Sequence, residues 1–370
     1  MQILKKKAPF GAERAHPPAP NAAVDGYGFA GPAGDGLQTM PLVSGRSAAG
    51  QPFGGAVPAG HAIRILTGAN LPQGVDTVVL QEDVRATDVT IRFHGPLKKG
   101  ANARNAGEDM QAGDVILPAG RKLTAGDIGM IGAAGVGQVT TYRPLRVGIL
   151  STGDELVAAG APATDGQIFD ANGPMLTALV AGWGHQATSL GRAPDEREKL
   201  RAMLDDAASR CDVILTSGGA SAGAEDHVSA LLSDTGSFAL WRIAMKPGRP
   251  LVMGMWQGTP VFGLPGNPVA AMVCAMVFGA PAFRLLAGGG WHAPQHFMLP
   301  AAFSKSKKDG RHEYLRARVE DGKISVFPSE GSGRVSGLSW ATGLVELPIQ
   351  AVTVREGDPV KFIPFAGFAT

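Results

Sequence analysis

The run CDVILTS at residues 211–217 ends in the loop GGASAGAEDH at residues 218–227. Two further apolar runs lie beside short polar loops: LVMGMW (251–256) after KPGRP (246–250), and TPVFGL (259–264) before PGNP (265–268). A strand that ends in a glycine-rich loop exposes backbone N–H groups, and these groups form an anion site when a helix begins next. The stretch therefore predicts a site for phosphate or another oxyanion.

Charged side chains of both signs lie in these loops. The KPGRP loop carries Lys246 and Arg249, and the glycine-rich loop carries Glu225 and Asp226. Cations bind an oxyanion, whereas carboxylates hold a divalent metal ion that neutralises phosphate charge. The mixture favours a metal-assisted reaction on a phosphorylated ligand over simple storage of a ligand.

The segment from 143 to 290 alternates strand-like and helix-like patterns. The runs LRVGILST (145–152) and HQATSLGR (185–192) are expected to be strands, and the patterns at 173–183 and 196–209 predict helices. Such alternation predicts a mostly parallel sheet with helices on both faces, and ligands bind at the carboxyl ends of its strands. We therefore expect an α/β and β multidomain protein, in which a central three-layer α/β/α domain is flanked by small β domains.

Polar side chains gather at the strand ends of this central domain. Glu155 follows the first strand, Asp170 and Asn172 precede the first helix, and Asp226 lies in the glycine-rich loop. Asp170 and Asn172 also fit an ordinary helix N-cap, and Asp226 also fits an acid that faces a helix dipole. Because all of them fall at one edge of the predicted sheet, their convergence favours a binding site.

Short β-like runs dominate the two flanks, residues 21–106 and 291–370, and predict a small β-rich domain in each. In the first flank, spacing alone favours Asp25 as a turn aspartate that bonds its own backbone. In the second, GSGRVSGLSW (331–340) is expected to be a loop, and Arg316 a surface charge.

Two segments carry little pattern of their own. Residues 1–20, rich in proline and alanine, are interpreted as a loose arm. Residues 107–142 are too short for an independent domain, so we expect them to pack against that arm or against a partner subunit. Glu108 and Asp109 in this segment are more typical of turn acids than of metal ligands.

Composition limits the possible function classes. A chain of 370 residues predicts two to four domains. With 34 Lys and Arg against 32 Asp and Glu, the net charge of +2 offers no basic field for nucleic acid. The two cysteines lie far apart in apolar segments, which favours buried thiols in a reducing compartment and hence the cytosol. No signal peptide and no membrane-spanning run are expected.

Eight motifs occur in order along the chain. They are DGY (25–27), RILTGA (64–69), GED (107–109), STGDEL (151–156), GQIFDAN (166–172), TSGGASAG (216–223), AMKPGRP (244–250) and GLPGNP (263–268). Together they resemble the molybdopterin molybdenumtransferase family, the molybdenum insertases that include bacterial MoeA and the gephyrin E domain. The resemblance covers the chain from about residue 21 onward, and it implies an L-shaped subunit of four domains, usually a homodimer, whose sheet domain binds the pterin.

The resemblance implies a reaction in which molybdate enters the dithiolene of adenylylated molybdopterin with Mg²⁺ and loss of AMP. By motif position it implies Asp226 as the principal catalytic acid, aided by Lys246, with Asp170, Glu155 and Asp226 as ligands of Mg²⁺. The implied substrate and molybdate site comprises Ser221, Gly218, Gly219, Arg249, Pro250, Pro265, Asn267, Pro268, Thr152 and Thr67. Asp25, Asp109 and Arg104 are implied to complete the site of a neighbouring subunit.

Family members carry two helices ahead of the DGY motif, whereas here only a Pro-rich stretch precedes it. We therefore expect residues 1–20 and 107–142 to form a remnant of the helical dimerisation domain. Two alternatives stay open: a catalytically impaired molybdopterin-binding paralogue or scaffold, and a molybdopterin adenylyltransferase, although the latter is normally the sheet domain alone. An adenylyltransferase is also an expected partner.

Overall fold

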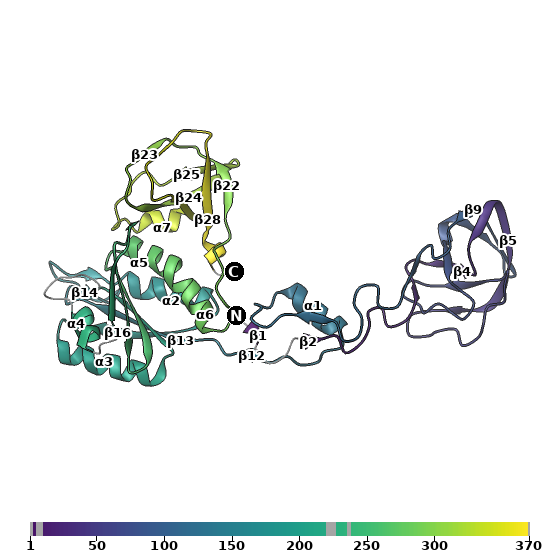
Figure 1. The fold of residues 1–370 in the computed structure, drawn as a ribbon, viewed down its shortest axis with the longest axis horizontal. Coiled ribbons are helices and arrows are strands. Elements are labelled where there is room, and N and C mark those ends of the chain that lie inside the picture. Colours follow the sequence, from purple (N-terminus) through teal and green to yellow (C-terminus); the bar gives the residue numbers. More distant parts are fainter. Residues whose placement is uncertain (1–2, 5–9, 220–226, 235–237, 369–370) are drawn as a thin grey trace. The chain divides into compact units, whose positions relative to one another are not determined.

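The computed structural model describes residues 3–4, 10–219, 227–234 and 238–368 (Figure 1). The chain divides into two compact units. The first comprises Thr140–Thr370 with Gly120–Lys122 and the first six residues, and the second comprises Lys7–Ala119 with Leu123–Val139.

A six-stranded sheet forms the centre of the first unit. Its strand order is β16-β13-β17-β21-β20-β18. The strands span Gln186–Ala193 (β16), Arg146–Thr152 (β13), Val213–Ser217 (β17), Thr259–Leu264 (β21), Pro250–Trp256 (β20) and Phe238–Arg242 (β18). The first four strands are parallel, and β20 and β18 run antiparallel to their neighbours. The mostly parallel α/β sheet predicted from the sequence is confirmed.

Helices cover both faces of this sheet (Figure 1). They are α2 (Asn172–Gly182), α5 (Pro268–Cys274) and α6 (Ala280–Leu286) on one face, and α3 (Arg197–Arg210) and α4 (His227–Asp234) on the other. Successive strand residues point to opposite faces. Val213 and Leu215 therefore enter the core beneath α2, whereas Ile214 enters the core beneath α3.

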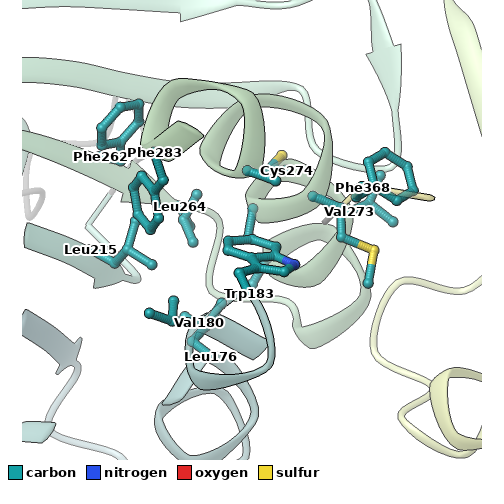
Figure 2. Close-up of a cluster of buried hydrophobic side chains, with 14 of the residues drawn as sticks. Leu176, Val180, Trp183, Leu215, Phe262, Leu264, Val273, Cys274, Phe283 and Phe368 are labelled. Carbon is teal, nitrogen blue, oxygen red and sulfur yellow. The ribbon is translucent and has the colours of Figure 1, made fainter. Parts of the chain in front are cut away.

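Phe283 is a member of the larger core and lies beside Phe262 and Leu215 (Figure 2). Its ring is fully buried and meets the rings of Trp183 and Phe262 edge-on, with centroids 5.9 Å away in both cases. Such aromatic pairs stabilise by about 0.5–1.5 kcal/mol beyond the burial of area. This packing ties α2 and α6 to β21, and so fixes the strand ends that carry the polar loops.

One helical segment is long and apolar. α5 and α6 are joined by a π-helical turn, Ala275–Gly279, so that Pro268–Leu286 is continuous over 19 residues. By length and composition alone this segment could cross a membrane, but 61% of its apolar window is buried inside the unit. Its packing against the sheet accounts for its apolar sequence.

A second sheet in the first unit combines strands from the predicted C-terminal flank with one short strand, β19, from the central segment. Its order is β19-β24-β26-β28-β22, and β25 also pairs with β24. The strands span Met245–Lys246 (β19), His312–Glu320 (β24), Gly343–Leu347 (β26), Pro359–Pro364 (β28), Phe297–Pro300 (β22) and Lys323–Val326 (β25). Because β19 leads into the KPGRP loop, this sheet is joined directly to the predicted oxyanion site.

Shorter elements complete the first unit. Two-stranded pairs are formed by β23 (Lys305–Lys307) with β27 (Val352–Val354), β14 (Leu156–Val157) with β15 (Ile168–Phe169), and β1 (Ile3–Leu4) with β12 (Thr141–Tyr142). A 3-10 turn covers Phe365–Phe368. The loop predicted at 331–340 is wrong in part, because it contains the short helix α7 (Ser336–Trp340), which buries Leu338 in the core.

The second unit is mainly β structure. Its six-stranded sheet has the order β7-β4-β6-β5-β9-β8. The strands span Thr77–Leu80 (β7), Gly26–Phe29 (β4), Ala62–Ile65 (β6), Ala33–Ser47 (β5), Thr90–Leu97 (β9) and Val84–Ala86 (β8), with a 3-10 turn at Gln81–Asp83. Phe29 and Phe93 are buried with ring centroids 5.4 Å apart. The β-rich flank predicted before residue 107 is present.

The loose arm predicted at residues 1–20 is wrong over its second half. β2 (Phe10–Gly11) pairs with β11 (Val115–Leu117), and β3 (Asn21–Ala22) pairs with β10 (Ala103–Arg104). A backbone bridge also joins His16 to Met110. These contacts are made by the backbone, so the side-chain pattern did not reveal them. The neighbouring helix α1 (Ala125–Ala133) begins with a capping box between Thr124 and Asp127.

Candidate functional site

Two adjoining cavities open at the carboxyl ends of the parallel strands. The first, of about 460 Å³, lies between the ends of β13 and β17 and the start of α4, and we call it the acidic cavity. The second, of about 500 Å³, lies against the KPGRP loop, and we call it the basic cavity. Gly218, Gly219, Gly266 and Asn267 line both. Together the cavities have the size of a small-molecule or cofactor site.

Asn172 joins three segments at this edge. Its buried side-chain nitrogen Nδ2 donates to Ser217 Oγ and to the carbonyl of Gly266, each at 2.6 Å. The start of α2, the end of β17 and the PGNP loop are thereby held together. Asn172 is thus more than the ordinary helix-entry residue that its position allowed, because its amide spans two loops of the cleft.

Two glycines are required by the shape of the acidic cavity. Gly218 has a φ of +93°, and a Cβ there would lie 2.6 Å from Thr152 Oγ1 and 2.8 Å from the Thr152 carbonyl. Gly153 has a φ of +135°, and a Cβ there would lie 2.3 Å from Glu155 Oε2. Since both φ values favour glycine, a side chain at either position would displace the strand ends or the Glu155 carboxylate.

Carboxylates line one side of the acidic cavity. Glu155 was predicted there, but Asp195 was missed. The backbone N–H of Asp195 donates to Asp154 Oδ1 at 2.9 Å, so the segment after β16 is tied to the segment after β13. A signal did exist, because the strand predicted at 185–192 ends just before Asp195 and at the same edge of the sheet.

These carboxylates fit a magnesium ion when a phosphorylated ligand is bound. Mg²⁺ is usually held by one or two carboxylates together with substrate phosphates, and Glu155 and Asp195 supply two carboxylates. Within the described ranges, no group of three or more His, Cys, Asp or Glu side chains could hold a metal ion. Asp170 does not line either cavity; its Oδ1 accepts from the backbone N–H of Gly173 at 2.9 Å.

The basic cavity contains both predicted cations. Lys246 and Arg249 line it. Lys246 is ion-paired to Glu330, with Nζ 2.5 Å from Oε2, and Arg249 is exposed. A tetrahedral dianion fits such a place, because cations and glycine N–H groups can surround it.

The structure brings most of the predicted residues of this cleft together. Those that line at least one of the two cavities are Thr152, Glu155, Gly218, Gly219, Lys246, Arg249, Pro250, Pro265 and Asn267. Pro268 lines neither cavity and forms the first turn of α5. Ser221 and Asp226 lie outside the described residues.

The second unit holds the remaining predicted residues. Asp25 Oδ1 accepts from the backbone N–H and the hydroxyl of Thr67, each at 2.7 Å, and these bonds lower the pKa of Asp25. The expectation that Asp25 bonds its own backbone is therefore wrong, since its partner is 42 residues away. Arg104 and Asp109 are exposed.

Arg316 was expected on the surface, and this is also wrong. It is only 4% exposed. Its guanidinium donates to the carbonyls of Ser329, Gly331 and Arg334, and lies over the ring of Phe327. Arg316 thus holds in place the segment that runs past the basic cavity.

Comparisons with known proteins cover nearly the whole chain. The family model for the MoeA N-terminal region (domain I and II) matches residues 7–135, that for a probable molybdopterin binding domain matches 148–285, and that for the MoeA C-terminal region (domain IV) matches 299–365. A molybdopterin molybdenumtransferase of Haemophilus influenzae is 36% identical over 353 residues, which cover 93% of this chain and 87% of the relative. The chain belongs to the molybdopterin molybdenumtransferase family.

Other proteins named for the same activity or for MoeA are also similar to this chain. A relative of that name from Nostoc is 34% identical over 313 residues, covering 81% of this chain and 71% of its own. A crystal structure of the molybdopterin biosynthesis MoeA protein from Pyrococcus horikoshii OT3 matches with a TM-score of 0.82 and 26% identity, over 98% of this chain and 91% of that one. The resemblance drawn from the eight motifs is confirmed, and membership makes the protein a transferase of molybdenum cofactor biosynthesis.

Proposed function

We propose that this protein inserts molybdate into adenylylated molybdopterin and releases AMP. The observation that supports the proposal most strongly is the cleft, where a cavity with carboxylates adjoins a cavity with Lys246 and Arg249. A pterin nucleotide carries a phosphoanhydride, and molybdate is a tetrahedral dianion. The two substrates together therefore need a surface with carboxylates and a surface with cations side by side.

In the basic cavity, Lys246 and Arg249 bind molybdate or the neighbouring phosphate beside Pro250, which lines the same cavity. By its position in the TSGGASAG motif, Ser221 is a further ligand of the oxyanion. Arg249 adds a planar group that can donate two parallel hydrogen bonds to one oxyanion, which a lysine cannot do. Both cations also place the oxyanion beside the dithiolene before reaction, and such orientation can supply a large part of a rate increase. Gly218, Gly219, Pro265 and Asn267 shape the wall that the two cavities share.

By motif position Asp226 is the principal catalytic acid, and Glu155 and Asp195 are the carboxylates that line the acidic cavity. Asp170, which accepts a backbone hydrogen bond at the start of α2, assists from outside the cavity. When bound, Mg²⁺ would neutralise charge on the phosphoanhydride, with Glu155, Asp195 and Asp226 as its protein ligands. Thr152 and Asn172 hold the strand ends together around the nucleotide.

A homodimer completes the site. Asp25, Thr67, Asp109 and Arg104 of the second unit act on the cleft of a second copy. The pair of Asp25 and Thr67 supports this role, because two hydrogen bonds from Thr67 keep the Asp25 carboxylate ionised and fixed. We place the reaction in the cytosol, with a molybdopterin adenylyltransferase as supplier of the adenylylated pterin.

Asp226→Asn tests the proposal. AMP release from adenylylated molybdopterin should fall by orders of magnitude, while pterin binding, followed by pterin fluorescence, should survive. Glu198→Gln, an exposed acid on α3, is the control and should release AMP like the wild type. Unchanged release by Asp226→Asn would reject the assignment, and tight pterin binding without release by the wild type would favour a catalytically impaired paralogue.

A further inference from the structure

Lys246 lies in a cluster of four alternating charges. Its Nζ is 2.5 Å from Glu330 Oε2 and 3.6 Å from Glu313 Oε1. The other oxygen of Glu330 contacts Lys305, whose Nζ is also 3.2 Å from Glu313 Oε2. Two cations and two carboxylates therefore balance before any ligand arrives, and we call these four residues the charge cluster.

The members of the charge cluster are not held equally. Lys246 on β19 pairs directly with Glu313 on β24, so the backbone fixes that pair. The side chains of Lys305 and Glu313 are partly buried, at 16% and 13% exposed, whereas that of Glu330 is 44% exposed. Arg316 donates to the carbonyls of Ser329 and Gly331, on either side of Glu330. The backbone of Glu330 is thus fixed, and its side chain is the part of the cluster with room to turn.

Glu330 and Lys246 stand between two cavities. Both line the basic cavity, and both also line a smaller cavity of about 200 Å³. Lys305 lines the smaller cavity but not the basic one. An oxyanion that approaches Lys246 from the basic cavity therefore meets the carboxylate of Glu330. Lys305, in the smaller cavity, is a second partner for that carboxylate.

We propose that Glu330 competes with the oxyanion for Lys246 and sets the affinity of the basic cavity, and that Lys305 retains the displaced carboxylate. The proposal rests on the function proposed above, in which Lys246 binds molybdate. While Glu330 contacts Lys246, an arriving oxyanion meets a carboxylate directly beside the ammonium group. Once Glu330 keeps only its contact with Lys305, Lys246 can pair with the oxyanion, and each charge of the cluster still has a partner.

The protonation state of Glu330 agrees with this exchange. Its hydrogen bonds with Lys246, and next with Lys305, lower the pKa of the Glu330 carboxyl. The competitor is therefore an anion at neutral pH. Burial alone would lower the pKa of Lys305, but Glu330 and Glu313 more than offset that effect and raise it, so Lys305 stays cationic.

Glu330→Gln tests the proposal by calorimetric titration of the purified full chain with molybdate. The amide keeps the shape of the side chain and removes the competing charge, so we expect molybdate to bind about two- to five-fold tighter, as for the loss of one partly exposed ion pair. Lys305→Met removes the second partner and should weaken molybdate binding by a similar factor. Glu320→Gln is the matched control, because it removes the same charge at an exposed pair with Arg318 on the same sheet, and it should leave the affinity unchanged.

Perrhenate, a tetrahedral monoanion, has to displace the same carboxylate, so its affinity should rise in Glu330→Gln by the same factor as that of molybdate. Repulsion from a distance scales with the charge of the anion, so a perrhenate gain near the square root of the molybdate gain would overturn the exchange. The exchange would also be overturned if the wild type binds molybdate and Glu330→Gln binds it with equal or lower affinity. If neither protein binds molybdate, the oxyanion site at Lys246 is itself rejected, which is a failure of the proposed function.

Discussion

Replacing Asn172 by Asp should loosen the cleft and destabilise the first unit. The change is isosteric but replaces the donor Nδ2 by a carboxylate oxygen. The hydroxyl of Ser217 can turn and donate to it, whereas the carbonyl of Gly266, 2.6 Å from Nδ2 in the wild type, would face another acceptor. Loss of that bond costs about 1 kcal/mol, and the unpaired acceptors add about 1–3 kcal/mol. We expect a loss of about 2–4 kcal/mol.

Urea unfolding followed by tryptophan fluorescence measures this loss. The five tryptophans, Trp183, Trp241, Trp256, Trp291 and Trp340, all belong to the first unit, so the signal reports on that unit alone. Displacement of the PGNP loop by even 1 Å should also lower AMP release, by about 100-fold. Burial raises the pKa of the introduced carboxyl, so at acidic pH it becomes a donor and the stability difference should shrink.

Thr177→Val is the control for this substitution. It removes one hydrogen bond on the same helix, from Thr177 Oγ1 to the carbonyl of Gly173, and touches neither cavity. Its cost should stay near 1 kcal/mol, with AMP release retained. Wild-type stability together with wild-type AMP release in Asn172→Asp would refute the role assigned to Asn172.

Three further substitutions test other parts of the structure. Asp212→Asn should lower stability at pH 7, and by a smaller amount at pH 2. Hydrogen bonds from Arg143 and then Arg146 depress the pKa of Asp212, so its contribution is fully present above the unfolded pKa of about 3.9 and is lost progressively as pH falls toward the folded value. Urea denaturation at both pH values measures the difference. Phe283→Ala should cost about 3–5 kcal/mol in urea unfolding, because the ring is fully buried. Arg316→Gln should speed amide hydrogen exchange in residues 329–334, because the carbonyls of this segment lose the Arg316 guanidinium as their donor. Exchange in the central sheet should change little.

The central sheet was predictable because its signals are local. β13 and β17 are short apolar runs bounded by polar loops, and α3 carries a helical pattern, so β16 and α2 could be placed from the alternation of strands and helices. Ligand-binding loops at the carboxyl ends of such strands follow from topology. Much of the cleft could therefore be located from the sequence.

The remaining features depend on contacts between distant residues. Asp25 finds Thr67 across 42 residues, and Arg316 is buried only because three carbonyls of a later segment converge on it. Glu330 lies in a polar stretch without periodicity, so its pairing with Lys246, 84 residues away, left no pattern in the chain. Contacts of this kind are tertiary, and side-chain spacing along the sequence carries no information about them.

The most direct test of the account is the dependence of AMP release on molybdate. The purified chain is mixed with adenylylated molybdopterin and Mg²⁺, and AMP and molybdenum-loaded cofactor are measured as molybdate is added. The account predicts that both products appear together and saturate with molybdate, and that Lys246→Met raises the molybdate concentration needed. Pterin binding with no molybdate-dependent release of AMP would contradict it.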